Sequence, residues 1–194
     1  MGWRGAVFGS ERPTVGRVTA IAFAAFMLAW LAYGLWVDFQ PEPWVRSLGL
    51  YPSVVLGVAT ATWLVWVNLS GRNEQFSGDR VALMVYAPLA ALMGTGLYWY
   101  VLTSGMTAAA TRVFGRPAST IVQFVTETNV NGCRYRAYGH VDRDYTYFHL
   151  CIPEAYYLAH PNRKVEMELT GYRSAFGFYV TGFEHRRDLG RRGY

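Results

Sequence analysis

The chain has 194 residues, of which 52% are hydrophobic and 16% are charged, and its formal net charge is +5. This charged fraction is lower than that of an ordinary soluble domain, so the composition excludes a soluble enzyme filling the whole chain, a disordered protein and a small disulfide-packed toxin. The basic residues are scattered rather than gathered in a block interleaved with aromatic residues, and we therefore expect no binding of nucleic acid.

Three segments without acidic or basic side chains are long enough to cross a hydrocarbon core about 30 Å thick. They are Val18–Val37, Ser47–Gly71 and Val81–Thr111. We therefore predict a transmembrane region of three helices over residues 18–104, which follows an N-terminal tail at residues 1–17 and is in contact with membrane lipid.

Prolines and aromatic residues mark the expected helix ends. Asp38 and the sequence Gln40-Pro41-Glu42-Pro43 are expected to end the first helix, because proline removes a backbone donor and acidic groups stay in water. The second helix is predicted over Pro52–Asn68. The third is predicted over Val81–Thr103, with a kink at Pro88.

Arginine counts predict the orientation, since positive residues are retained on the cytoplasmic side. Five arginines fall in the N-terminal tail and the second loop: Arg4, Arg12, Arg17, Arg72 and Arg80. Three fall in the first loop and after the third helix: Arg46, Arg112 and Arg116. We expect a cytoplasmic N-terminus and a periplasmic C-terminal region, in the inner membrane of a Gram-negative-like cell.

The predicted helices contain small residues four positions apart, which would let helix backbones approach closely. Pairs that suggest helix–helix association are Gly57 with Ala61 and Ala90 with Gly94. No Asp, Glu, Lys, Arg or His lies inside a predicted span. Transport or intramembrane catalysis by this chain alone is therefore not expected.

After the helices the pattern changes to short strands rich in β-branched and aromatic residues. Five strands and one short helix are predicted in the order β-β-β-α-β-β: Thr120–Thr126, Cys133–His140, Tyr145–Ile152, the helix Pro153–Leu158, Lys164–Thr170 and Phe176–Phe183. An OB-like barrel has this order, and an SH3-like barrel or an open meander would give nearly the same pattern.

The expected domain boundaries follow from these elements. Residues 105–117 are predicted to be a linker, residues 118–184 a small, mostly β, extracytoplasmic domain, and residues 185–194 a solvated basic tail.

The two cysteines, Cys133 and Cys151, are predicted to form a disulfide. If the intervening hairpin turns about Asp142, within the sequence Asp142-Arg143-Asp144, the two residues lie directly opposite each other on neighbouring strands. Oxidation is the expected state outside the cytoplasm, and the bridge would close a loop of about 18 residues.

A weaker alternative makes Cys133, His149 and Cys151 ligands of zinc or copper, with His140 as a further candidate. The spacing lacks the usual metal-binding signature, and His140 has the opposite strand parity from Cys133. A thiol-redox role is weaker still, because reactive cysteines usually lie close together in sequence. We therefore predict no cofactor.

Hydrolytic catalysis is not expected either. Ser174 lacks a nucleophile elbow, and its candidate partners, His185 and Asp188, lie in the predicted tail. Glu166 and Glu168 are two residues apart in an alternating strand, which makes them its solvent face rather than a paired-carboxylate site.

The predicted β-domain has more aromatic residues than its core needs, and arginines lie among them. Both residue types are enriched where proteins bind each other. The partner-binding candidates are Arg134, Tyr135, Arg136, Tyr138, Tyr147 and Phe148. A second interpretation places half of the rings in the core and the others against the membrane or its helices. Ligands outside the cytoplasm could be a protein, a glycan or lipid headgroups.

The sequence favours an inner-membrane accessory or assembly subunit of a cell-envelope complex, not an enzyme, whose β-domain binds a protein. The first alternative is an immunity or exclusion protein that blocks an incoming toxin or conjugation apparatus. The second is a metal-handling or thiol-redox membrane protein built on Cys133, His149 and Cys151.

Overall fold

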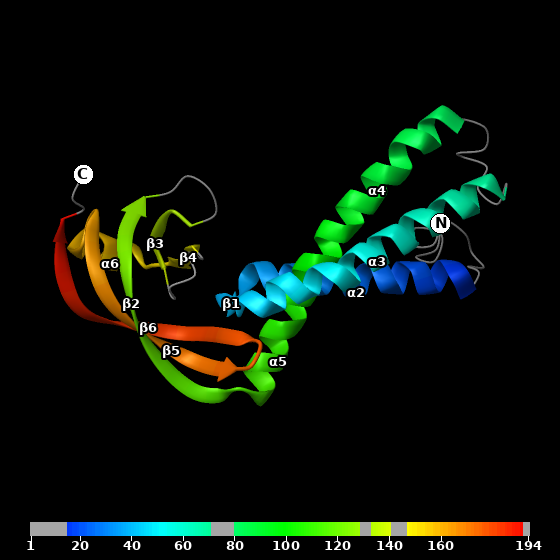
Figure 1. The fold of residues 1–194 in the computed structure, drawn as a ribbon. Helices are drawn as coiled ribbons and strands as arrows, with labels where there is room; N and C mark the ends of the chain where they lie inside the picture. Colours follow the sequence, from blue (N-terminus) through cyan, green and yellow to red (C-terminus); the bar gives the residue numbers. More distant parts are fainter. Residues whose placement is uncertain (1–14, 71–79, 129–132, 141–146, 192–194) are drawn as a thin grey trace, which may run out of the picture. The chain divides into compact units, whose positions relative to one another are not determined.

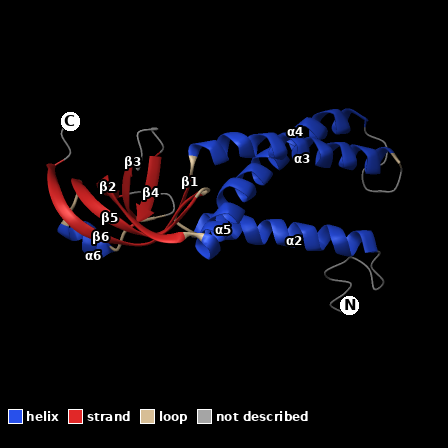
Figure 2. Ribbon diagram, turned by 60° about the horizontal axis from the view of Figure 1, so that its bottom comes forward, coloured by secondary structure: helices blue, strands red, loops and turns tan. Residues whose placement is uncertain are grey.

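A computed structural model describes residues 15–70, 80–128, 133–140 and 147–191. The chain forms two compact units. The helical unit comprises Met1–Trp36 and Ser47–Met106, and the β unit comprises Val37–Arg46 and Thr107–Tyr194. All the described strands belong to the β unit, whereas the long helices belong almost entirely to the helical unit (Figures 1 and 2).

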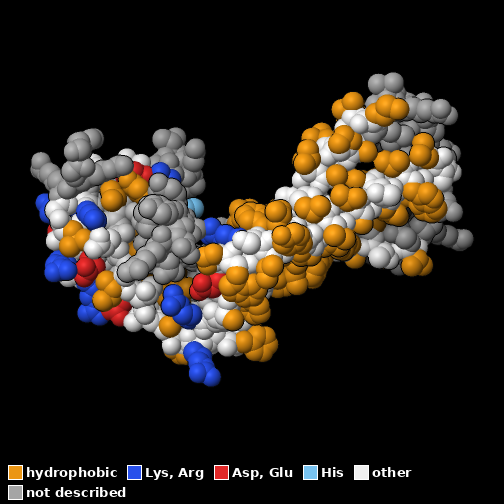
Figure 3. All heavy atoms as spheres, in the orientation of Figure 1, with side chains coloured by type: hydrophobic (Ala, Val, Ile, Leu, Met, Phe, Trp, Pro, Cys, Tyr) orange, Lys and Arg blue, Asp and Glu red, His pale blue; other side chains and the backbone are white. Residues whose placement is uncertain are grey.

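The helical unit is built from long apolar helices. They are α2 (Val15–Trp36), α3 (Pro43–Leu69, whose first residues belong to the β unit), α4 (Arg80–Tyr100) and the π-helix η1 (Val101–Met106). Three stretches are long and apolar enough to cross a membrane: Val18–Trp36, Pro43–Val67 and Met84–Phe114. Hydrophobic side chains cover the visible face of these helices, whereas acidic and basic side chains gather on the β unit (Figure 3).

Small residues let the helices of this unit approach closely. A Cβ added to Gly57 on α3 would lie 2.7 Å from the backbone nitrogen of Thr95 and 2.8 Å from the carbonyl oxygen of Ala91, both on α4. The Cα of Gly57 is also the nearest neighbour of a Cβ built on Gly94, at 3.5 Å. Ala61 is buried, and Ala90 is half-buried. Helix packing by small residues therefore operates within this chain.

Polar side chains add contacts between these helices. The hydroxyls of Thr60 and Tyr98 lie 2.9 Å apart, and the Tyr100 hydroxyl donates to the carbonyl oxygen of Gly34 at 2.9 Å. Where no water competes, such hydrogen bonds help to fix which helices associate.

Two helix boundaries differ from the prediction. The second helix begins at Pro43 rather than Pro52, because proline is well suited to the first helical turn, where its missing N–H has no partner to lose. Most of the predicted linker, residues 105–117, is also wrong: η1 runs directly into α5 (Thr107–Phe114). The longer helices therefore include Arg46 and Arg112, which both belong to the β unit.

The β unit is a nearly closed, barrel-like antiparallel sheet. Its strands are β1 (Phe39–Pro41), β2 (Arg116–Thr128), β3 (Tyr135–His140), β4 (Tyr147–Cys151), β5 (Arg163–Ser174) and β6 (Gly177–Arg191). Their order is β1-β6-β5-β2-β3-β4, and helix α6 (Glu154–Ala159) lies between β4 and β5 in the chain. The long strands β2, β5 and β6 are strongly curved (Figure 1).

Alternating apolar residues build the core of this unit. Val165, Met167 and Leu169 on β5 are completely buried, as are Phe124 on β2 and Ala137 on β3. The residues between them on β5 point outward. This alternation confirms that Glu166 and Glu168 belong to the solvent side of the strand.

Two parts of the sheet were not expected. The segment Phe39–Pro41, predicted only as a helix stop, is an edge strand whose Gln40 pairs with Phe178 of β6. The predicted tail is wrong over residues 185–191, because β6 continues through them, paired with β5. Its composition is polar because this end of the strand carries ion pairs with β5 rather than a second apolar face.

Candidate functional site

One face of the strands β2, β3 and β4 points away from the core, and we call it the outer face. The strand register aligns two rows of residues on it: Glu127, Arg136 and Cys151; and Val125, Tyr138 and His149. The intervening residues point inward, as the buried Phe124, Ala137 and Leu150 show. The sequence-predicted Arg136 and Tyr138 are therefore neighbours on one surface.

An ion pair and a ring contact hold this arginine. The Arg136 guanidinium pairs with the carboxylate of Glu127, and its Nε donates to Oε1 of the same residue at 2.6 Å. Its Cζ lies 5.9 Å from the centre of the Tyr138 ring. A guanidinium so positioned is partly oriented before any partner arrives.

Arg134 and Tyr135 lie next to the outer face but differ from each other. Arg134 is exposed, and its Cζ lies 5.4 Å from the Tyr135 ring centre. Tyr135 stacks on Tyr157 at 4.9 Å between ring centres, and its hydroxyl donates to Glu154 at 2.8 Å. That hydrogen bond raises the pKa of Tyr135, with a smaller contribution from desolvation. Tyr135 thus supports the core, and Arg134 is available at the surface.

Tyr147 and Phe148 are the two remaining binding candidates. Phe148 is wrong as a surface residue, because it is buried and packs on Phe124 with 6.3 Å between ring centres. On an alternating strand only every second residue faces the surface, so Phe148 is buried beside the exposed His149. The side chain of Tyr147 lies outside those that the structure describes.

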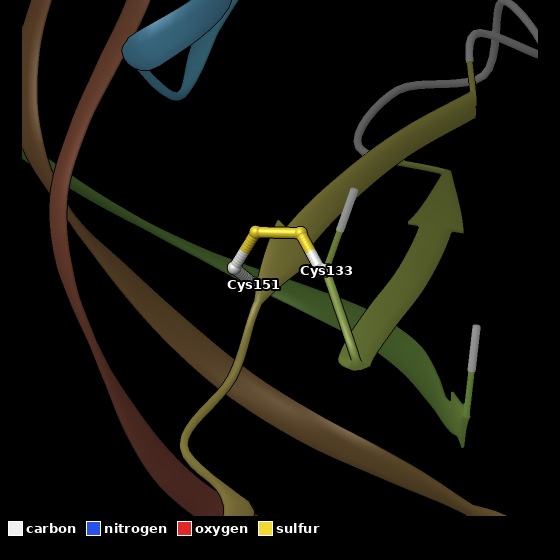
Figure 4. The surroundings of a disulfide bond; sticks show 2 residues. All are labelled: Cys133 and Cys151. Atoms are coloured by element: carbon white, nitrogen blue, oxygen red, sulfur yellow. A yellow bond between two sulfur atoms is a disulfide. The ribbon is translucent and has the colours of Figure 1, made fainter. Parts of the chain in front are cut away.

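Cys133 and Cys151 form a disulfide beside the outer face (Figure 4). Their Cα atoms are 5.5 Å apart, an ordinary separation for a bridge. The register that led to the prediction is nevertheless wrong, since Cys151 pairs with Arg136 rather than with Cys133. The connection spans residues 141–146, longer than a tight turn about Asp142, and Cys133 lies just before β3. The predicted turn itself is outside the described residues.

The two cysteines of the metal hypothesis cannot act as ligands while the disulfide is formed. The sulfurs of Cys133 and Cys151 are bonded to each other, so neither is a thiolate that could ligate a metal. His149 is exposed on the outer face, next to Cys151 in the strand. The side chain of His140 is not among those described.

Asp38, the residue before β1, has a pKa shifted by its surroundings. Burial raises the pKa of Asp38, and the charge of His149 on edge strand β4 opposes this by a smaller amount.

The residues considered for hydrolysis do not come together. Ser174 lies where β5 turns into β6, and its hydroxyl is 2.7 Å from that of Thr111 on α5. His185 is opposite Met167, which lies seven residues and therefore about 23 Å along β5 from Ser174. Glu166 and Glu168 form ion pairs with Arg187 and Arg186 of β6. No Ser-His-Asp triad forms among these residues.

His185 and Asp188 instead lie beside His160, a residue that no local sequence pattern marks. The rings of His160 and His185 stack with 4.4 Å between their centres. Little in the sequence indicates this group of three residues. The group forms only because β6 continues beyond its predicted end.

Searches of protein families, of curated proteins and of solved structures each find no match to this chain.

Proposed function

We propose that the protein is an accessory or assembly subunit of a cell-envelope complex, anchored in the inner membrane by three helices, whose β unit binds a protein partner outside the cytoplasm. The outer face is the feature that most directly supports this proposal. It combines an oriented arginine, Arg136, with the ring of Tyr138 and the exposed His149 beside a disulfide. Arginine and tyrosine contribute strongly to protein–protein binding when a partner covers them.

Membrane insertion is supported by the surface of the helical unit. Large apolar side chains such as Leu35, Leu92 and Met84 are between 70% and 76% exposed. In water this surface would be an aggregation hazard, whereas lipid tails would cover it. The absence of charged residues from most of each candidate span fits the same environment.

Aromatic residues of the β unit support a position at the membrane surface. Trp44 and Phe176 are both exposed, with their ring centres 6.1 Å apart, and the Trp44 Nε1–H donates to the carbonyl oxygen of Ala175 at 3.1 Å. Tryptophan prefers the headgroup level, where its ring contacts lipid and its N–H remains bonded. Phe114, at the end of α5, is 82% exposed and would contact the same region.

The proposed orientation puts the N-terminus in the cytoplasm and the β unit in the periplasm. It is supported by the five arginines in the N-terminal tail and second loop against three in the other segments. The disulfide between Cys133 and Cys151 also fits an oxidising compartment.

We further propose that the β unit is an OB-like barrel. The strands after the helices keep the order β-β-β-α-β-β, which fits an OB-like barrel, and β1 extends it at the edge of β6.

Partner capture from detergent-solubilised cells tests this function. An Arg136→Ala/Tyr138→Ala variant removes the two side chains that the proposal requires. Arg187→Ala is the matched control, because it removes an exposed, ion-paired arginine from the outward side of β6. We expect a stoichiometric partner with wild type and control, and at least a tenfold loss with the double variant.

Equal recovery of the partner with the double variant would contradict the outer face as the binding site. Failure of wild type to retain any partner in unchallenged cells would contradict a resident subunit and favour the immunity or exclusion alternative. Thermal unfolding of each variant shows whether a loss of binding merely reflects a loss of fold.

A further inference from the structure

Three side chains with metal-ligand chemistry converge at the end of the β unit that carries α6. His160 follows α6, and His185 and Asp188 lie on β6. One ligand atom from each residue lies within 4.8 Å of the other two. Imidazole nitrogens and a carboxylate oxygen are the ligands that zinc and similar divalent transition metals take from proteins.

A buried hydroxyl fixes the backbone that carries this group. Thr126 is completely buried, and its hydroxyl donates to the carbonyl oxygen of His160 and accepts from the backbone N–H of Arg163 at 3.0 Å. The turn from His160 to Arg163 is therefore held on β2. Asn162 in this turn has a φ of 51°, a conformation that asparagine adopts more readily than most residues.

The neighbours of the three residues orient them further. Arg163 donates to Oδ2 of Asp188 at 3.2 Å, and Oδ1 of the same carboxylate lies 3.0 Å from Nδ1 of His160. The Tyr156 hydroxyl lies 2.8 Å from Nδ1 of His185. If that nitrogen carries the proton and donates to Tyr156, Nε2 of His185 retains its lone pair for a metal, an arrangement common around metal-ligating histidines.

One buried atom in this group lacks a hydrogen bond. Nδ1 of His160 is inaccessible to solvent and makes no hydrogen bond to any residue that the structure describes. It is close to Oδ1 of Asp188, but the ring does not direct an N–H at that oxygen. Buried polar atoms are nearly always satisfied, so this one indicates a missing partner. A spacing of 3.0 Å also suits two ligand atoms that share an ion about 2.1 Å from each.

We propose that His160, His185 and Asp188 form a binding site for a divalent transition metal, with Zn²⁺ as its probe. The three residues leave a fourth position for water or another ligand, and Tyr156 and Arg163 hold His185 and Asp188 from outside the coordination shell. The metal connects the turn after α6 to the last part of β6. This metal site depends neither on the membrane orientation nor on a protein partner.

Metal binding requires one local rearrangement. The rings of His160 and His185 are stacked at an interplanar angle of 14°, so their lone pairs lie in nearly parallel planes. A shared ion needs the two planes to tilt toward each other. His185 is exposed, so its ring has room to do so.

The test is zinc binding by the full chain, purified in detergent with a tag that contains no histidine. The four histidines provide their own control, since two lie in the cluster and the other two, His140 and His149, lie on strands β3 and β4. Bound zinc is measured by competition with a chromophoric chelator and by metal analysis. Thermal unfolding is recorded with and without zinc.

We expect one zinc ion per wild-type chain and a higher unfolding temperature when zinc is bound. His160→Ala, His185→Ala and Asp188→Asn should each weaken binding about tenfold or more, and His140→Ala/His149→Ala should bind as wild type does. Tyr156→Phe, which keeps the ring, should weaken binding about tenfold by releasing His185. The zinc affinity of a variant is interpreted only if the variant still unfolds cooperatively without zinc.

Absence of stoichiometric zinc in the wild type would overturn the proposal. So would zinc that survives all three cluster variants, or zinc that is lost in the His140→Ala/His149→Ala control, since the ligands would then be elsewhere. If all three cluster variants failed to fold, Tyr156→Phe and zinc protection of the wild type would decide the question.

Discussion

The helical unit and the β unit use apolar residues in opposite ways. In the β unit Phe124, Met167 and Leu169 are completely buried, whereas in the helical unit Trp36 is 90% exposed. Contacts in the helical unit depend on small residues such as Gly57 and on hydrogen bonds between helices. The β unit has a core that can form in water, whereas the helical unit has an apolar surface of the kind that lipid tails would cover.

The largest expected effect tests the core of the β unit. Phe124→Ala should lower the free energy of unfolding by about 3 to 5 kcal/mol, because it leaves a cavity in a close-packed interior. Ile121→Ala, on the same strand but 61% exposed, is the matched control and should have little effect. Urea unfolding in detergent, followed by protease resistance of the β unit, measures both. Equal effects at the two positions would contradict the assigned core.

The disulfide should have the next largest effect. Replacing both Cys133 and Cys151 by serine frees a loop with a sequence separation of 18 residues. In the chain-entropy model this costs about 3 kcal/mol. The variant should unfold at lower urea than oxidised wild type, and wild type with reductant should match it. No difference between oxidised and reduced wild type would contradict a stabilising bridge.

Close packing in the helical unit can be tested with glycines. A Cβ on Gly57 would overlap backbone atoms of α4, whereas one on Gly96 meets no atom within 4 Å. Gly57→Ala should therefore destabilise the unit by about 1 to 3 kcal/mol. Gly96→Ala should be neutral or stabilise it by up to about 1 kcal/mol, because alanine favours the helix. Thermal unfolding in detergent should separate the two, and identical behaviour would mean that α3 and α4 do not meet at Gly57.

The smallest expected effect concerns pH. Burial raises the pKa of Asp38 above 3.8, despite the opposing charge of His149, so the folded protein holds this proton more tightly than the unfolded chain. Stability should therefore fall as the pH rises from about 3.8 through the raised pKa, and remain lower at neutral pH. Asp38→Asn should raise the unfolding temperature at neutral pH and flatten this part of the profile. An exposed control, Glu184→Gln, should not do so.

The sequence predicted what depends on local patterns. Uncharged apolar runs predicted three long helices, and the alternation of Val165, Met167 and Leu169 predicted a strand with one buried side. The disulfide was also predicted, although from the wrong register. In that case the general proximity of Cys133 and Cys151 was sufficient, since a bridge tolerates several strand alignments.

Features that depend on distant parts of the chain could not be predicted. Phe39–Pro41 reads locally as a proline-rich helix stop, and it becomes a strand only because β6 offers an unpaired edge. The polar end of β6 reads as a solvated tail, because its stabilising partners are charged residues on β5. The same long-range pairing brings His185 and Asp188 to His160.

The most direct test of the central proposal is labelling of the two cysteines in intact cells with a membrane-impermeant maleimide, before and after reduction. A β unit outside the cytoplasm with its disulfide formed should be labelled only after reduction. Labelling without reduction would contradict the bridge while keeping the orientation. Labelling only after the membrane is permeabilised, with or without reductant, would put the β unit in the cytoplasm and contradict the proposed function.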